Sequence, residues 1–465
     1  MTSLKHSASQ KLAIHSSPNA VGLNRRNFLK TSAAVAGTAM LGTVELSRSV
    51  HAAENNTIHL ALIGCGGRGS GAVVNAYEAA GGPVKLTVMA DLYENRLKSA
   101  YKNLKTKFAD KMDVPDDRKF VGFDAYRKAI DCLRPGDVAM LTGYSGFRAL
   151  QLEYAVEKGV NVFMEKSFGP DAPSLRRLIK AGEAAEKKNL KIAAGLQCRH
   201  SRNRKDLLKR IRDGQMGDIQ FIRAYRMQQC GWLAPRKPES NELEWQLRHF
   251  THFLWVSGGL FAEMNIHQID ELCWIKDAWP VTAHGVGGRA ANNTDCSQNL
   301  DSLSIEWTFP DGTKAYDVVR WLPKCYPEFA TFIHGTKCAA QFSGPHHIGT
   351  VRTYKDQRIA RENIAWEAES EPITPWQAEW EALLDAIRNN KPHNEAKRAG
   401  FSNIADLMGR AAVHSGQMIT WEQMMNSNFQ LCPNIDSLNA DSPAPVKDDA
   451  HGRYPVPVPG VWTEV

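Results

Sequence analysis

The chain has 465 residues, of which 43% are hydrophobic and 23% are charged, and its formal net charge is +7. This composition is that of a globular protein long enough for two domains with separate cores, and it excludes a largely disordered chain. The first 53 residues hold six Lys or Arg and one Glu, which leaves 51 basic against 49 acidic residues in the remainder. A nearly neutral remainder argues against a nucleic-acid partner, which requires a clustered basic surface.

The N-terminal segment has the pattern of an export signal. "NRRNFLKTSAAVAGTAMLG" (24–42) places Arg25 and Arg26 before a small and apolar stretch that is too short to span a membrane. We therefore predict that residues 1–53 are a twin-arginine (Tat) signal peptide, that the Tat translocase is a partner during export, and that the mature protein is periplasmic. An amphipathic N-terminal helix is the alternative, although residues 33–41 have no polar face.

Nine cysteines are scattered along the chain, an odd number without any C-x-x-C pair. This pattern indicates neither a disulfide framework nor a zinc ribbon. Export without planned disulfides is consistent with a protein that folds in the cytoplasm and is then transported intact.

A glycine-rich loop lies between a predicted strand and a predicted helix in "TIHLALIGCGGRGSGAVVNAYEAA" (57–80). Gly64, Gly66 and Gly69 stand in the G-x-G-x-x-G register of dinucleotide-binding loops. The first glycine allows a tight turn, the second a close approach to a pyrophosphate, and the third close packing of the helix on the strand. The free N–H groups at the helix N-terminus then bind the phosphates, and we expect Gly67 to take part.

The end of the next strand indicates which dinucleotide is bound. The strand predicted over 84–92 carries Asp91, where a carboxylate accepts both ribose hydroxyls and repels a 2′-phosphate. We therefore expect NAD, tightly bound, with NADP as the alternative because Arg68 and Arg96 stand close by in the sequence. A glycine turn without any nucleotide is the remaining interpretation.

Strands and helices continue to alternate after this unit. The predicted elements are a strand at 137–142, a helix near 147–158, a strand at 160–165, a helix near 172–187 and a strand at 191–196. Alternation at this spacing predicts a doubly wound parallel sheet, which binds ligands beyond the carboxyl ends of its strands. That rule places Thr142, Glu165 and Lys166 beside the cofactor and Gln197 beside the substrate.

After residue 196 the pattern changes to strands in series, which predicts a largely antiparallel sheet. The predicted strands are 217–228, 281–289, 301–309, 314–321, 328–334, 338–343 and 350–355, with helices at 203–213, 376–389 and 401–417. The expected fold is α/β, with an N-terminal Rossmann domain (54–196) and a C-terminal α+β domain (197–430) with an open sheet. The last segment (431–465) is predicted to be extended and to form an interface or a domain swap.

One further stretch, "GGLFAEMNIHQID" (258–270), carries three polar residues at helical spacing. Glu263, His267 and Asp270 fall at i, i+4 and i+7 on one stripe of a helix. The spacing alone is compatible with three interpretations: half of a metal site, an acid/base cluster, or a salt-bridged helix surface. Trp245 and Arg248 precede this helix in a segment whose mix of aromatic and polar groups suits a sugar ring, although core tryptophans have the same pattern.

In combination these motifs resemble the Gfo/Idh/MocA family of oxidoreductases over roughly residues 57–430. The chain shows the G-x-G-x-x-G loop, an "EKS" tripeptide in place of the family's EKP, and a glycine-led helix with an acid four residues before a histidine. The resemblance implies that Lys166, Glu263 and His267 are catalytic and that Asp270 lies at the substrate. Ser167 replaces the family's proline, and "TGYSGFR" (142–148) lacks the proline and histidine that many members have there.

The resemblance implies an NAD(P)-dependent oxidoreductase that acts on a secondary alcohol of a sugar, polyol or related compound. His267 would remove the hydroxyl proton while Lys166 stabilises the developing alkoxide. A metal is not expected, because no second ligand pair occurs at comparable spacing. The alternatives are an NAD-dependent glycoside hydrolase or lyase that oxidises the sugar transiently, and a non-catalytic sugar-binding protein. We also expect a homo-oligomer formed through the C-terminal sheet.

Overall fold

The first half of the described chain forms a parallel sheet. The computed structural model describes residues 56–290, 293–344 and 350–465, so the predicted signal peptide lies outside the described residues. Six strands pair in the order β3-β2-β1-β4-β5-β6, each parallel to its neighbours. They are β1 (Ile58–Ile63), β2 (Val84–Asp91), β3 (Lys119–Val121), β4 (Val138–Leu141), β5 (Asn161–Met164) and β6 (Ile192–Ala194). The predicted doubly wound sheet is confirmed.

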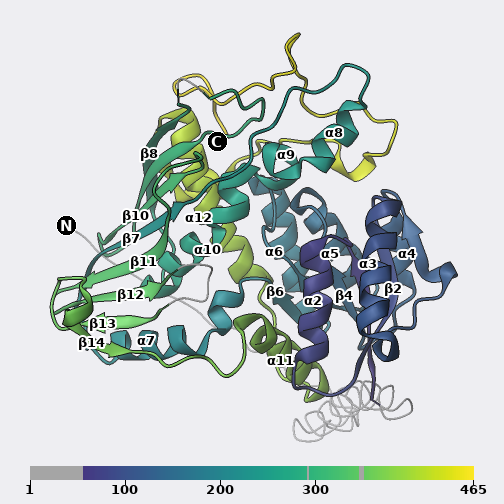
Figure 1. Cartoon of the computed structure of the whole chain (residues 1–465), viewed down its shortest axis with the longest axis horizontal. Coiled ribbons are helices and arrows are strands. Elements are labelled where there is room, and N and C mark those ends of the chain that lie inside the picture. The colour runs from purple at the N-terminus through teal and green to yellow at the C-terminus, as the bar shows by residue number, and fades with distance from the viewer. Residues whose placement is uncertain (1–55, 291–292, 345–349) are drawn as a thin grey trace, which may run out of the picture. The chain divides into compact units, whose positions relative to one another are not determined.

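Helices cover both faces of this sheet (Figure 1). Leu60 and Leu62 of β1 pack with helices on one face, whereas Ala61 and Ile63 pack with helices on the other. Side chains alternate along a strand, so a strand buried on both faces reads as one apolar run. The helices of the first face are α2 (Gly67–Glu78), α3 (Glu94–Lys107) and α11 (Pro375–Arg388), and those of the second are α4 (Ala125–Asp131), α5 (Arg148–Glu157) and α6 (Ala172–Lys187).

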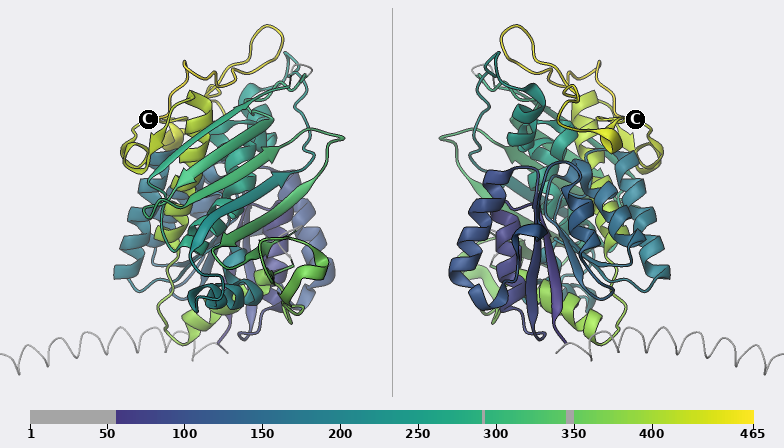
Figure 2. Two further views of the ribbon diagram at one scale, coloured as in Figure 1. Left: turned by 90° about the vertical axis from the view of Figure 1, so that its left-hand side faces the viewer. Right: turned by 90° about the vertical axis from the view of Figure 1, so that its right-hand side faces the viewer.

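The second half forms a nine-stranded sheet in the order β14-β13-β12-β11-β7-β10-β9-β8-β15. Its strands are β7 (Ile219–Met227), β8 (Thr282–Gly288), β9 (Ser302–Thr308), β10 (Lys314–Arg320), β11 (Glu328–Gly335), β12 (Ala339–Ser343), β13 (Arg352–Tyr354), β14 (Ile364–Glu367) and β15 (Ile419–Thr420). All neighbouring strands are antiparallel except β7 and β10, which are parallel. The largely antiparallel sheet is thus confirmed, and Figure 2 (left) shows its strands in front of the helices that cover the inner face.

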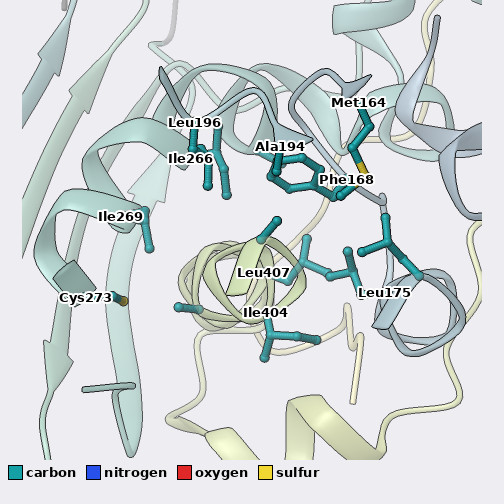
Figure 3. Close-up of a cluster of buried hydrophobic side chains, with 14 of the residues drawn as sticks. Met164, Phe168, Leu175, Ala194, Leu196, Ile266, Ile269, Cys273, Ile404 and Leu407 are labelled. Carbon is teal, nitrogen blue, oxygen red and sulfur yellow. The ribbon is translucent and has the colours of Figure 1, made fainter. Parts of the chain in front are cut away.

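Two long helices, α10 (Gly259–Lys276) and α12 (Ala396–Ser415), lie between the two sheets (Figure 1). Their apolar side chains join a core that also includes residues of β5, β6 and α6, such as Met164 and Leu175 (Figure 3). The remaining helices of this half are α7 (Arg202–Arg212), α8 (Glu242–Arg248), α9 (Leu254–Ser257) and α13 (Trp421–Asn426). Because one core spans both halves, residues 54–465 form a single compact unit, and the boundaries expected at 196 and 430 stay predictions.

The C-terminal tail packs on its own chain rather than projecting from it. Glu464 is buried, where its carboxylate accepts from Arg410 Nη2 at 2.5 Å and lies 2.8 Å from His414 Nδ1. Tyr454 packs edge to face on Phe253, with ring centroids 4.7 Å apart. The tail is therefore a part of this unit, and its expected role in an interface or a domain swap stays a prediction.

Three further features bear on the predictions. The elements α3, β3 and α4 lie in the segment 92–136, for which the sequence pattern gave no prediction. All nine cysteines are described and are free thiols, consistent with the expected lack of a disulfide framework. Among the described residues, no helix is both long and apolar enough to cross a membrane.

Candidate active site

The glycine loop between β1 and α2 has the conformation that its sequence predicts. Gly64 has a φ of +101°, and a Cβ on it would lie 2.4 Å from the backbone nitrogen of Gly143. A Cβ on Gly69 would lie 2.1 Å from the carbonyl oxygen of Gly64, so this position allows the helix to approach the strand. Gly66 and Gly67 instead face open space. Gly66 also caps α2 without any side-chain hydrogen bond, so the N–H groups of the first turn are available to a ligand.

A cavity of about 790 Å³ opens beside this loop, at the carboxyl ends of the parallel strands. Ligands of doubly wound sheets bind at this edge. All the predicted cofactor-binding residues line the cavity, namely Gly64, Gly66, Gly67, Arg68, Gly69, Asp91, Arg96, Thr142, Glu165 and Lys166. The second half of the chain contributes Phe250 and Glu263 to its wall.

Asp91 holds the glycine loop in addition to lining the cavity. Its carboxylate accepts a hydrogen bond from the Cys65 N–H at 2.6 Å and another from the Tyr93 N–H at 2.8 Å. Burial raises the pKa of Asp91, while these two N–H groups and Arg96 act in the opposite direction. The carboxylate is therefore fixed at the end of β2, with lone pairs remaining for a ligand in the cavity.

The two arginines of the cavity are both engaged by protein groups. Arg68 Nε donates to Glu165 Oε1 at 2.5 Å, which joins the first turn of α2 to the end of β5. Arg96 Nη1 donates to the Tyr144 hydroxyl at 2.7 Å. Each guanidinium thus lines the cavity while it is positioned by a partner.

Lys166 and Glu263 meet at the boundary between the two halves. Lys166 Nζ donates to Glu263 Oε1 at 2.6 Å and to the Glu263 carbonyl oxygen at 2.7 Å. The hydroxyl of Ser167 donates to Glu263 Oε2 at 3.2 Å, and the Lys166–Ser167 peptide bond is cis. The two charged side chains are only 17% and 13% exposed, so the ion pair is largely desolvated and fixed in position.

The structure separates the predicted helical triplet of α10. Glu263 lines the cavity, whereas His267 is buried one turn further along and does not belong to the cavity wall. Asp270 is also buried, and its carboxylate accepts from Arg199 Nε at 2.9 Å and from the Ser402 hydroxyl at 2.5 Å. Asp270 therefore lies in a buried ion-pair cluster and does not line the cavity.

The other predicted substrate residues also lie away from the cavity wall. Gln197 is buried in the short helix that follows β6. Trp245 lies against His249 in a tilted arrangement with ring centroids 4.1 Å apart, and the exposed Arg248 covers the ring of Tyr93 at 4.0 Å. Neither Arg248 nor Tyr93 lines the cavity, although the Tyr93 N–H donates to Asp91, which does.

Aromatic side chains that the sequence did not single out line the cavity instead. They are Phe123, Tyr126, Tyr144, Phe147 and Phe250. Tyr144 and Phe147 belong to the "TGYSGFR" segment, whose position directly after a strand was the available signal. Phe250 lies against Tyr144 with ring centroids 5.4 Å apart, and only the folded chain brings them together.

The residues present fit a dinucleotide. Gly66 and Gly67 leave open space where a pyrophosphate approaches, and the uncapped N-terminus of α2 offers N–H donors to its negative charge. Asp91 stands at the end of β2, where a carboxylate reaches ribose hydroxyls. The glycine loop, α2 and Asp91 together therefore form a nucleotide-binding edge.

Comparisons with known proteins bear on both parts of the chain. Residues 22–42, which include Arg25 and Arg26, match the family model described as the TAT (twin-arginine translocation) pathway signal sequence. The protein is therefore exported by the Tat pathway to the periplasm. No curated protein sequence matches this chain.

Solved structures resemble the described part. An aldose-aldose oxidoreductase from Caulobacter crescentus is 15% identical, with a TM-score of 0.60 and coverage of 78% of this chain and 99% of that one. A scyllo-inositol dehydrogenase from Lactobacillus casei, with bound NAD(H) and scyllo-inositol, is 20% identical (TM-score 0.59, coverage 79% and 99%). A UDP-N-acetylglucosamine 3-dehydrogenase from Acidithiobacillus ferrooxidans is 19% identical (TM-score 0.54, coverage 77% and 98%).

The described part of the chain shares the fold of these oxidoreductases. At these identities the likeness shows the fold alone, which is the fold that the sequence motifs predicted. The glycine loop, the end of β5 and the start of α10 are the parts of this fold that form the cavity described above.

Proposed function

We propose that this protein is an oxidoreductase that transfers a hydride between NAD and a secondary alcohol of a sugar, polyol or related compound. One observation carries the proposal: the Lys166–Glu263 ion pair lines the same cavity as the glycine loop. A dinucleotide on that loop and a hydroxyl at Lys166 would occupy a single site. The fold shared with the NAD(H)-bound scyllo-inositol dehydrogenase supports the assignment.

The side chains of the cavity favour NAD over NADP. Asp91 supplies a carboxylate where a 2′-phosphate would be repelled. Arg68 and Arg96, the two cations that could bind such a phosphate, are held by Glu165 and Tyr144. We therefore assign the ribose hydroxyls to Asp91 and the pyrophosphate to the N-terminus of α2.

Lys166 is the residue that would hold the reacting oxygen. When bound, the nicotinamide supplies the acceptor or donor of the hydride, and oxidation of an alcohol releases one proton besides. The ammonium of Lys166 stabilises negative charge on the substrate oxygen, and Glu263 keeps this ammonium in place through Oε1. The carboxylate of Glu263 can take the proton that Lys166 passes on, because the two groups are 2.6 Å apart.

Two aromatic rings give the cavity an apolar wall near this pair. Tyr144 and Phe250 come from different halves of the chain and lie in contact with each other. Sugar rings pack their C–H faces on aromatic rings, while hydroxyl groups need polar partners. We therefore infer a ring-shaped polyhydroxy substrate, with Lys166 and Glu263 as its polar contacts.

Export places a constraint on the cofactor. A periplasmic protein has no evident supply of fresh NAD, so we propose that the cofactor is bound before export and stays bound. Protein purified without added NAD should release the nucleotide on denaturation, detected by absorbance and fluorescence. Addition of a suitable sugar or polyol to the native protein should reduce the bound cofactor once and then stop, unless a second substrate accepts the hydride.

Two results would contradict this proposal. Protein without nucleotide that also fails to bind added NAD or NADP would exclude a nicotinamide enzyme. Continuous cleavage of a glycoside without net reduction of NAD would instead assign the site to the redox-assisted hydrolase.

A further inference from the structure

A second cluster of chemically active side chains lies outside the cavity wall. Two histidines and two glutamates come together from three segments: His200 follows β6, Glu379 lies on α11, and His393 and Glu395 lie between α11 and α12. Ligand atoms of His200, Glu379 and Glu395 all lie within 4.8 Å of one another. His393 Nε2 is 4.0 Å from Glu395 Oε2. These are the side-chain types that bind divalent transition metals.

Backbone hydrogen bonds position two of these side chains. Residues 393–395 run alongside β6, where the Ile192 N–H donates to the His393 carbonyl at 2.9 Å and the Glu395 N–H donates to the Ile192 carbonyl at 3.0 Å. In extended backbone the side chains of residues i and i+2 project to the same side. The edge of the parallel sheet therefore presents His393 and Glu395 together, and the Ala194 N–H fixes Glu395 Oε2 at 2.9 Å.

Glu379 is the observation that points to a ligand. Its side chain is fully buried, and neither carboxylate oxygen has a hydrogen-bond partner among the described residues. The Nε2 atoms of His200 and His393 are likewise buried without a hydrogen bond in the described part of the chain. A buried carboxylate that lacks hydrogen-bond donors costs roughly several kcal/mol as an anion. A bound cation would remove that cost.

Other carboxylates buried nearby have the partners that Glu379 lacks. Asp270 pairs with Arg199, and Glu271 pairs with Arg204 and accepts from the Thr331 hydroxyl. Glu395 itself pairs with Arg398 at 2.6 Å. Arg68 and Arg398, whose charges also act on Glu379, donate their hydrogen bonds to Glu165 and Glu395. Glu379 is therefore left without a hydrogen-bond donor among the described residues.

We propose that His200, Glu379, His393 and Glu395 bind one divalent transition-metal ion, with zinc as the ion of best fit. Two imidazole nitrogens and two carboxylate oxygens make a four-coordinate donor set of the kind that zinc accepts. Arg398 donates to Oε1 of Glu395 and the Ala194 N–H donates to Oε2, as groups that orient metal ligands do, and each oxygen keeps a lone pair for an ion. The donor atoms of His200, Glu379 and Glu395 lie within 4.8 Å of one another, and His393 Nε2 lies 4.0 Å from Glu395 Oε2, so side-chain rotations would bring all four donors around one ion.

The position of the cluster indicates a structural role for this metal. It joins the stretch made of α11 and the α11–α12 connection to the segment after β6, which is far from that stretch in the sequence. A surface hollow of about 360 Å³ is lined by His200 and Glu395 together with Arg199, Lys205 and Arg212, so these two members of the cluster face the hollow. The cluster does not line the cofactor cavity, so its occupancy can be measured independently of any activity.

The experiment measures metal content and metal-dependent stability. Purified full-length mature protein is analysed by elemental mass spectrometry, stripped with a chelator, and titrated calorimetrically with Zn²⁺, Mn²⁺, Co²⁺ and Ni²⁺ in turn. We expect about one equivalent of Zn²⁺ per chain, and a rise in Tm of about 3 °C at saturation. His200→Ala and Glu379→Gln should each weaken zinc binding by about 100-fold or more. Residues that bind the metal directly contribute at least as much to its affinity as the groups that orient them.

A matched control and two contrary outcomes make the test decisive. His284→Ala removes a histidine that lies 3.4 Å from Glu306 on the second sheet, and it should leave zinc binding unchanged. Glu379→Gln keeps the shape of the side chain, and circular dichroism compares the folding of this variant with that of the wild type. If the Glu379→Gln variant does not fold, zinc binding is measured on His393→Ala instead. Wild-type protein that binds none of the four metals would overturn the proposal and leave Glu379 as a neutral buried acid. Full zinc affinity in the Glu379 and His393 variants would also overturn it.

Discussion

Replacement of Lys166 by alanine is expected to lower turnover by about 10²–10⁴-fold, the usual range for loss of a positioned proton-transfer or charge-stabilising group. This range corresponds to roughly 3–5 kcal/mol of the activation barrier. Two features of the structure support a loss of this size. The ammonium makes hydrogen bonds of 2.6 and 2.7 Å, and the two side chains of the ion pair are 17% and 13% exposed. A group that is desolvated and fixed in this way cannot be replaced by water at similar strength.

Substitutions at Glu263 test whether the pair acts as one unit. Glu263→Gln keeps an oxygen that can accept from Lys166 but removes the negative charge, so we expect a smaller loss of turnover, about 10-fold or more. The Lys166→Ala, Glu263→Gln double variant should be no slower than Lys166→Ala alone, because residues that act on one oxygen have non-additive effects. Additive losses would place the two residues in separate steps.

His267 is tested in the same series. The sequence motif implies that it is the general base, and on that prediction His267→Ala lowers turnover by about 10²-fold and is also non-additive with Lys166→Ala. Because His267 is buried and does not line the cavity, this substitution is the strictest test of the three roles that the sequence motif implies. Unchanged turnover would restrict His267 to the packing of α10.

The assay follows reduced-nicotinamide absorbance after a sugar or polyol is mixed with protein whose NAD content has been measured. Lys276→Ala is the matched control, because Lys276 forms a Lys–Asp pair with Asp311 at 2.5 Å away from the cavity. It should leave turnover unchanged. A Lys166→Ala variant with full NAD content and turnover within about threefold of wild type would refute the assignment of Lys166.

The remaining predictions concern the cofactor, export and pH. Asp91→Ala should weaken NAD binding and narrow the preference for NAD over NADP, both measured by calorimetry. It should also lower Tm, because the Cys65 and Tyr93 N–H groups lose their acceptor. A wild-type protein that prefers NADP would refute the role of Asp91. Arg25→Lys with Arg26→Lys should retain the precursor in the cytoplasm, as followed by cell fractionation, because the twin arginines are recognised as a pair. Burial raises the pKa of Asp317 to about 7, so the folded protein holds a proton that the unfolded chain releases above about pH 4. The free energy of unfolding should therefore fall as the pH rises from about 4 to about 7, and denaturant titrations should show a flatter profile for Asp317→Asn.

Local sequence patterns were sufficient to predict the alternating strands and helices of the parallel sheet. The run 57–63 is apolar because β1 is buried on both faces, and the glycine spacing after it reflects two close backbone approaches. The segment 92–136 was not predicted, because α3 is polar around most of its circumference and β3 has only three residues. The parallel pairing of β7 with β10 could not be predicted either, because the two strands are far apart in the sequence and no local pattern indicates which strands pair.

Helical periodicity predicted the helix α10 but not which of its polar residues line the cavity. The stripe of Glu263, His267 and Asp270 was expected to face the cofactor together. Fourteen of the eighteen residues of α10 are buried, because the helix lies between two layers and has no solvent side. On such a helix a polar stripe does not identify the cavity face, so the ion pairing of Asp270 had to come from the structure.

The core between the two halves explains how the site keeps its geometry. Met164 and Phe168, on either side of Lys166 in the chain, pack in one cluster with Ile266, Ile404 and other apolar residues of α10 and α12 (Figure 3). Each buried side chain of this size contributes roughly 1.5–3 kcal/mol, so separating the halves would cost far more than a ligand contact returns. Lys166 and Glu263 are thus held in position before any substrate arrives, which lowers the entropic cost of reaction. Discrimination between substrates must then come from the wall that faces this fixed pair, where Tyr144 and Phe250 lie outside the long helices and strands of the core.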